Sequence, residues 1–196
     1  MKVAISGTSG IGKTTLASAL AEVFQWPMLD EQHSEIIANG AALRRARASG
    51  NKEAILPAIN ACRNTVVNWL NSREAHLYNR DHIIADRAAM DVILYWLELD
   101  LSQGDRCDLD RIFLRCHKHM TLFDLVVFPP VPSKALKNEG EHARHRPESI
   151  SRSVLSHSAL LGLAQQIGGT KIAVLPKTLS TTEDQVRKLQ RLIETS

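Results

Sequence analysis

The chain has 196 residues, of which 44% are hydrophobic; this composition is enough for one sizeable core, and the length favours a single domain spanning 1–196. A net charge of +3, with no run of five or more like charges, argues against a nucleic-acid partner and a solvated tail. No stretch approaches the roughly 18 consecutive apolar residues of a membrane span, and Ser6 and Gly7 interrupt the N-terminus before it reaches signal-peptide length.

The three cysteines, Cys62, Cys107 and Cys116, are scattered without a C-x-x-C pair. An odd, unpatterned count favours a reducing cytoplasm over a disulfide framework, so we expect a cytoplasmic protein. Cys116 and His117 are adjacent and point to different sides of a helix, so we expect no zinc site there.

The N-terminal residues carry a specific motif. The segment KVAIS at 2–6 has the apolar run of a buried strand, and an apolar stripe at helical spacing begins at Leu16. Between them, Gly7 is followed after four residues by Gly12, Lys13 and Thr14, which is the G-x-x-x-x-G-K-[ST] phosphate loop.

The residue types of this loop fit phosphate binding. Its glycines let successive backbone N–H groups point inward and surround phosphate oxygens at the positive end of the next helix. We expect Lys13 to be exposed in the loop and to reach the β- and γ-phosphates, Thr14 to hold magnesium, and Thr15 to contact the α-phosphate. The residues expected to bind the nucleotide are Gly7, Thr8, Ser9, Gly10, Ile11, Gly12, Lys13, Thr14 and Thr15.

Strand and helix patterns alternate along the rest of the chain. Short strands are expected at 26–30 and 82–87, and core strands at 124–130 and 170–176. Helices are expected at 88–101, with Gly104 beyond the end, at 109–120, and at 181–196, with Thr181 or Thr182 as the cap. The region 31–80 is helical, and because Pro57 suits a first turn, one helix there should begin near residue 53 or 54.

This alternation predicts a parallel sheet with helices on both faces, and such sheets bind ligands beyond the carboxyl ends of their strands. Asp86 and Arg87 follow three apolar residues at one such end. Asp86 either orients a magnesium-bound water or acts as a base, or else it caps a helix; Arg87 either clamps a phosphate or an acceptor, or is solvated. Asp91, one turn later, is assigned mainly to the helix.

Asp30 and Glu31 follow the strand at 26–30. Asp30 is either the N-cap of the next helix, a position that aspartate prefers, or one of this pair is the general base that receives the acceptor's proton. His33 and Glu35 are expected on a helix face.

The segment 133–152 loses its large apolar residues after Leu136 and becomes polar and basic. It is either a lid, at about 133–147, that brings cations over a phosphate, or a solvated loop. Arg144 and Arg146, just before Pro147, are its leading candidates for catalysis.

These motifs resemble those of P-loop kinases of small molecules, and most of all the nicotinamide riboside kinase-like group of ATP-binding AAA-type domains and the neighbouring deoxynucleoside and thymidylate kinases. The resemblance is carried by GTSGIGKTT at 7–15, IIADRAAMDVILYW at 83–96, FDLVVFPP at 123–130, and the arginine-containing segment before a helix and the final strand.

The resemblance implies a three-layer α/β fold of the P-loop NTPase type, with a five-stranded parallel sheet in the order 2-3-1-4-5, helices on both faces and a lid. It also implies ATP and Mg²⁺ as cofactors, Asp86 as the acid at the strand end with Arg87 beside it, and lid arginines at the transferred phosphoryl group. Four aromatic residues either stack on a base or belong to the core: Phe24, Trp69, Tyr95 and Trp96.

The favoured hypothesis is transfer of the γ-phosphate of ATP to a small-molecule acceptor, a nucleoside or nucleotide, bound by the helical region 31–80. Its candidate catalytic residues are Lys13, Asp30, Asp86, Arg87, Arg144 and Arg146, with Thr14 and Asp86 at the metal. The alternative is a nucleotide-binding switch or ATP hydrolase that acts on a macromolecular partner. A homodimer is compatible with either hypothesis.

Overall fold

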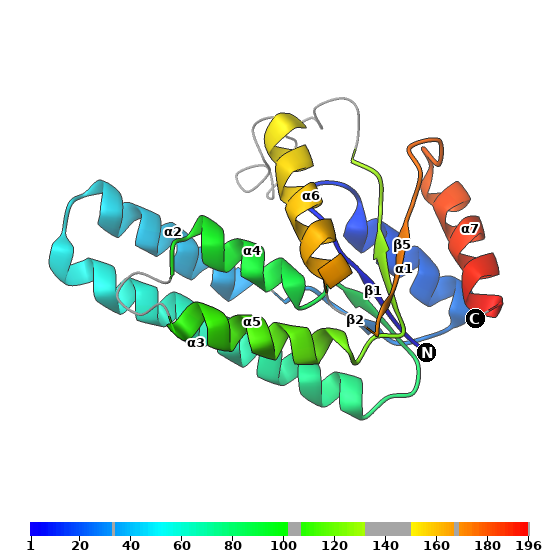
Figure 1. Ribbon diagram of the computed structural model, residues 1–196, viewed down its shortest axis with the longest axis horizontal. Coiled ribbons are helices and arrows are strands. Elements are labelled where there is room, and N and C mark those ends of the chain that lie inside the picture. The colour runs from blue at the N-terminus through cyan, green and yellow to red at the C-terminus, as the bar shows by residue number, and fades with distance from the viewer. Residues whose placement is uncertain (33, 102–106, 132–149, 167–168, 196) are drawn as a thin grey trace.

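The computed structural model describes residues 1–195 apart from 33, 102–106, 132–149 and 167–168. Within these residues a five-stranded parallel sheet lies between two layers of helices (Figure 1). The order β2-β3-β1-β4-β5 confirms the predicted fold class. The strands are β1 Lys2–Ile5, β2 Met28–Leu29, β3 Ile83–Asp86, β4 Leu125–Phe128 and β5 Lys171–Val174.

Two hydrophobic cores lie on the two faces of the sheet, because successive side chains of a strand point to opposite faces. Val3 and Ile5 of β1 pack with α1 and α7, whereas Ala4 packs in the core formed with α2 to α6. The helices are α1 Lys13–Phe24, α2 Ser34–Ala48, α3 Lys52–Tyr78, α4 Met90–Glu98, α5 Cys107–Met120, α6 Ile150–Gln166 and α7 Thr182–Glu194.

Two sequence-based expectations about these elements are wrong. Helix α3 begins at Lys52, close to the predicted start, with the Asn51 side chain accepting from Ala54 N at 3.3 Å, but Pro57 lies inside the helix and not in its first turn. Burial of one long face of α3 outweighs the hydrogen bond that proline cannot donate. Strand β5 is an edge strand and not a core strand: it pairs with β4, and Val174 is 51% exposed.

The chain leaves β1 and β3 at neighbouring points. Ile5 pairs with Asp86, and just beyond these strands Ser6 N donates to Val127 O at 2.8 Å and Arg87 N donates to Ile5 O at 2.9 Å. The loop after β1 and the turn after β3 therefore start side by side. Helices α2 and α3 pack on each other and project beyond the sheet (Figure 1). In the described part of the chain, no helix is both long and apolar enough to cross a membrane.

Candidate active site

The loop between β1 and α1 has the backbone that its glycine spacing predicts. Gly12, the N-cap of α1, has a φ of +85°, in the left-handed region that favours glycine. Gly7 has a φ of +132°, and a Cβ atom there would lie 2.7 Å from Ile11 Cδ1 and 3.0 Å from His157 Nδ1. Both glycines let the loop lie against the amino end of α1, where N–H groups and the helix dipole favour an anion.

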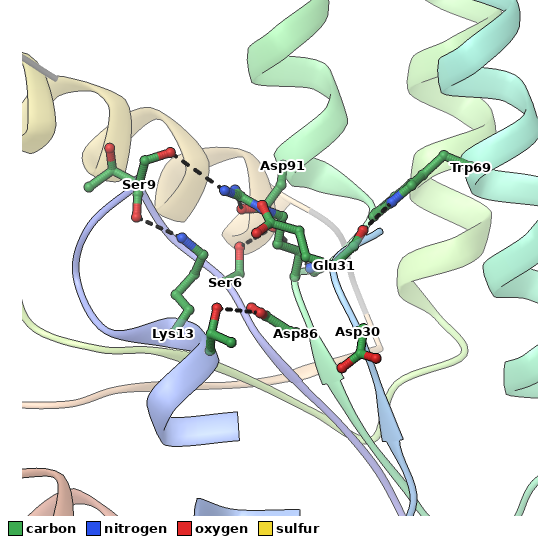
Figure 2. A network of polar contacts seen from close by, with 12 residues as sticks. Ser6, Ser9, Lys13, Asp30, Glu31, Trp69, Asp86 and Asp91 are labelled. Carbon is green, nitrogen blue, oxygen red and sulfur yellow. Dashed lines mark hydrogen bonds and ion pairs between the residues drawn. The ribbon is translucent and has the colours of Figure 1, made fainter. Parts of the chain in front are cut away.

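Lys13 is buried, at 5% exposure, which corrects the expectation of an exposed side chain. Its Nζ donates to Thr8 O at 2.8 Å, across the loop (Figure 2). Burial, reinforced by the positive charge of Arg87, lowers the pKa of Lys13 to about 7, against the opposing effect of Asp91 and Asp86. Lys13 is therefore folded back onto the Thr8 carbonyl. An anionic ligand bound in the loop would replace this hydrogen bond.

Thr14 and Asp86 meet beyond the carboxyl ends of β1 and β3. Thr14 Oγ1 donates to Asp86 Oδ2 at 2.6 Å, and Asp86 is 1% exposed. Burial raises the pKa of Asp86, against the Thr14 hydrogen bond and the charge of Lys13, which lower it. Asp86 is not a helix cap, because it ends β3 and α4 begins at Met90 with Ala89 as its N-cap.

The residues present fit a magnesium ion. Asp86 Oδ1 is buried and has no hydrogen-bond partner among the described residues, and the Thr14 hydroxyl lies beside the same carboxylate. Hydroxyl and carboxylate oxygens are ligands suited to Mg²⁺, which commonly takes only one or two from protein and the rest from water and phosphate. Within the described residues no cluster of three His, Cys, Asp or Glu is placed to hold a metal.

Arg87 lies at the centre of a buried charged network. Its φ of +77° is a left-handed conformation, which is strained for a residue with a side chain. Its guanidinium forms an ion pair with Glu31 and another, at 3.2 Å, with Asp91. Of the two alternatives for Arg87, the solvated one is wrong, since Arg87 is 6% exposed and held between two carboxylates.

Asp91 belongs to this network, and its assignment mainly to the helix misses that role. Its Oδ2 accepts from Ser6 Oγ at 2.8 Å and from Ala88 N at 2.9 Å, and Asp91 is 2% exposed. Asp91 thus ties the start of the loop after β1 to the turn after β3. The four-residue spacing of Arg87 and Asp91, with opposite charges, is the signal in the sequence that points to their pairing.

Asp30 and Glu31 take different positions. Asp30 is not the N-cap of the next helix, since α2 begins at Ser34, and its side chain is exposed. Glu31 is the one whose carboxylate pairs with Arg87. Asp30 directly follows β2, whose Leu29 pairs with Ala85 of β3. Asp30 and Glu31 therefore lie at the same carboxyl end of the sheet as Asp86.

Other predicted site residues lie elsewhere or outside the described part of the chain. The lid at about 133–147, with Arg144 and Arg146, falls outside the described residues, as do His33 and Gly104, so the role of the lid stays a prediction. The aromatic residues considered for base stacking pack in or against the two cores: Phe24, Trp69, Tyr95 and Trp96. His157 of α6, which lies against Gly7, was missed; its Nδ1 has no hydrogen-bond partner among the described residues.

A phosphate loop after the central strand of this sheet defines a P-loop NTPase fold. A family profile with the description AAA domain matches residues 2–181, and the chain belongs to this AAA-domain family. No curated protein matches the chain in sequence.

Solved structures share the fold over nearly the whole chain. Deoxyadenosine kinase from M. mycoides, with products dCMP and a flexible dCDP bound, has 18% identity and a TM-score of 0.68, with 100% of each chain covered. Shikimate kinase from Acinetobacter baumannii, in complex with shikimate, has 16% identity and a TM-score of 0.56, covering 99% of this chain and 93% of that one. Thymidylate kinase from Candida albicans has 17% identity and a TM-score of 0.56, covering 99% and 91%.

Proposed function

We propose that this protein is an ATP-dependent phosphotransferase that moves the γ-phosphate of ATP to a small metabolite, a nucleoside or nucleotide. The observation that carries the proposal is the Thr14–Asp86 hydrogen bond, which joins the phosphate loop to a buried acid at the neighbouring strand end. The names of the structures with this fold, among them a deoxyadenosine kinase and a thymidylate kinase, support the same reaction class and acceptor.

The phosphate-loop side of the site binds ATP. The loop backbone and the amino end of α1 surround the phosphates, and Lys13 exchanges its bond to Thr8 O for a phosphate oxygen. Thr14 and Asp86 are the residues that would hold Mg²⁺, which would neutralise phosphate charge when bound. Positioning and charge provide most of the catalysis in such transfers.

The other side of the site binds the acceptor. Glu31 is the carboxylate best placed to take the proton of an acceptor hydroxyl, because it reaches the buried network while the Asp30 side chain is exposed. Arg87 holds Glu31 in place and lies next to the phosphate loop, with Nη2 3.5 Å from Ser9 Oγ. Helices α2 and α3, within the region 31–80, form the wall against which the acceptor binds.

A panel of acceptors tests the proposal. The protein is incubated with ATP and Mg²⁺ and, one at a time, nucleosides, nucleotides, sugars and shikimate-like hydroxy acids, and release of ADP is measured. We expect release that depends on a nucleoside or nucleotide and a matching phosphorylated product. ADP release that is independent of every acceptor contradicts the proposal and favours a hydrolase or switch.

A further inference from the structure

Two residues of α3, Trp69 and Arg73, reach the ends of two strands at the site. They are one helical turn apart, so their side chains lie on the same face of α3. Both are buried, at 7% and 1% exposure, and Arg73 Cζ lies 4.5 Å from the centroid of the Trp69 ring. Trp69 Nε1 donates to Glu31 O at 2.6 Å, the backbone carbonyl of the residue that pairs with Arg87 (Figure 2).

Arg73 holds three more backbone carbonyls. Its Nη1 donates to Asp30 O at 2.7 Å, just beyond β2. Its Nη2 donates to Asp86 O at 3.0 Å and to Arg87 O at 2.7 Å, at the end of β3. A single guanidinium therefore connects the chain after β2 with the turn after β3.

The two bonds of Nη2 bracket the strained residue. Asp86 O belongs to the peptide before the Arg87 Cα atom, and Arg87 O belongs to the peptide after it. The orientations of these two peptides define the φ and ψ of Arg87, whose φ is +77°. Strained backbone persists only where surrounding contacts fix it, and Arg73 supplies such contacts on both sides.

The charge of Arg73 indicates that its role is more than filling space. Burial lowers its pKa to about 10, and the nearby carboxylates Asp86, Asp91 and Asp30 oppose this shift, so the side chain is charged at neutral pH. Burying a charge is unfavourable, and a hydrophobic side chain would fill the same volume without that penalty. The planar fork of an arginine, however, reaches several carbonyls at once, which an apolar side chain or a lysine does not.

We propose that Arg73 is a positioning residue of the phosphotransfer site, which fixes the turn at Arg87 so that Arg87 meets Glu31 and Asp91 while Asp86 meets Thr14. This inference rests on the proposed function. Arg73 itself touches no reacting group; it acts through the backbone that carries Asp86 and Arg87.

The test compares Arg73→Lys with Arg115→Lys. Arg115 on α5 is a matched control, because it also packs on α3 but contacts the side chains of Asn71 and Glu74. Turnover, ATP affinity, thermal unfolding and amide hydrogen exchange are measured on each full chain. Arg73→Gln, which keeps one donor group without the charge, replaces Arg73→Lys if that variant does not fold.

We expect Arg73→Lys to bind ATP within about twofold of wild type and to lose at least about tenfold in kcat, while Arg115→Lys keeps its kcat. The amides of Arg87 and Ala88, bonded to Ile5 O and Asp91 Oδ2, should exchange at least about tenfold faster in Arg73→Lys only. Addition of guanidinium to Arg73→Gly should restore part of the lost kcat.

Unchanged exchange at Arg87 and Ala88, or a kcat of Arg73→Lys within twofold of wild type, overturns the inference. So does an equal loss of kcat in the two variants. If wild type transfers no phosphate to any acceptor, the proposed function fails by itself. Faster amide exchange confined to Arg87 and Ala88 then still supports the inference that Arg73 fixes this backbone. Unchanged exchange still contradicts it.

Discussion

Thr14 and Asp86 are 72 residues apart in the chain, yet Thr14 Oγ1 donates a hydrogen bond of 2.6 Å to Asp86 Oδ2. The sheet order explains their meeting. Because β3 pairs with β1 so that Ile5 stands beside Asp86, the loop that follows β1 starts next to the last residue of β3. Parallel pairing thus places a phosphate loop and an acid at the same carboxyl end of the sheet.

Replacement of that acid by its amide tests its charge. Asp86→Asn keeps an acceptor for the Thr14 hydroxyl and removes a buried negative charge, so we expect the melting temperature to stay at or above that of wild type. Turnover should fall by about 10²-fold or more if the carboxylate binds the metal ion or accepts a proton. ATP should still bind, through the loop backbone.

Asp124→Asn is the control for Asp86→Asn. Asp124 accepts from Lys2 N at the opposite end of the sheet, and its side chain is 58% exposed. It should turn over like wild type. Normal turnover in folded Asp86→Asn contradicts the role assigned to Asp86.

Lys13→Met tests the buried lysine of the phosphate loop. The pKa of Lys13 is about 7 in the folded protein and 10.5 ordinarily, so between these values the unfolded chain binds more protons. The contribution of Lys13 to stability is therefore lowest below pH 7 and rises as the pH increases to 10.5. We expect Lys13→Met to raise the melting temperature at neutral pH, to flatten its rise with pH, and to reduce the stabilisation by ATP.

Lys188→Met, on an exposed position of α7, provides the comparison for this pH series. It should follow wild type at every pH and keep its response to ATP. A Lys13→Met protein that ATP stabilises as strongly as wild type is incompatible with the phosphate-loop assignment.

Much of the fold could be predicted from local patterns. The apolar runs predict the strands, and the spacing from Gly7 to Thr14 predicts the loop together with the flanking strand and helix. The sheet order came from the family resemblance and not from periodicity, because hydrophobic spacing carries no information on which strands pair. For the same reason the pattern at 170–176 does not distinguish a core strand from the partly exposed edge strand β5.

The candidate site was harder to predict, because its contacts join residues far apart in the chain. Asp86 and Arg87 follow an apolar strand and so are visible as residues at a sheet edge. Two contacts depend on how α3 packs, which no local pattern shows. One is the ion pair of Glu31 with Arg87, and the other is the hydrogen bond of Arg73 to the turn after β3. The burial of Lys13, at 5% exposure, likewise does not follow from the spacing of the motif.

His119→Leu should stabilise the protein. His119 is fully buried on α5, and neither ring nitrogen has a hydrogen-bond partner among the described residues. Burial, with added effects of Arg73 and Arg115, lowers its pKa to about 3. Removing an unsatisfied buried polar group should add about 1–3 kcal/mol to the free energy of unfolding.

The gain from His119→Leu should grow in acid. The unfolded chain binds a proton at the ordinary pKa of 6.5 while the folded protein does not until about pH 3, so wild type loses stability as the pH falls between these values. Urea titrations at neutral and mildly acidic pH measure the difference. His117→Leu, two residues away and less buried, is the comparison; an equal gain in both variants contradicts the argument.

Gly7→Ala should lower both stability and ATP affinity. The new Cβ would lie 2.7 Å from Ile11 Cδ1 and 3.0 Å from His157 Nδ1, at a φ of +132° that side chains rarely adopt. A loss of more than about 1 kcal/mol is expected from strain at such a position. Gly162→Ala in α6 has open space for the added methyl and should instead stabilise, by about 0.5–1 kcal/mol. Equal effects of the two changes on unfolding would remove the steric argument.

The last prediction distinguishes the two acids after β2. Glu31→Gln should lower kcat by about 10²-fold or more, because the Glu31 carboxylate is the one that enters the buried network through Arg87. Asp30→Asn should lower it by less than about tenfold, because its side chain is exposed and its backbone carbonyl, which Arg73 holds, is unchanged by the substitution. Both amides are nearly isosteric with the acids, so similar melting temperatures are required for a valid comparison.

Turnover is measured with the acceptor that the panel identifies, over a range of pH. At each pH we expect the loss of kcat to be larger for Glu31→Gln than for Asp30→Asn. The reverse pattern assigns the base to Asp30.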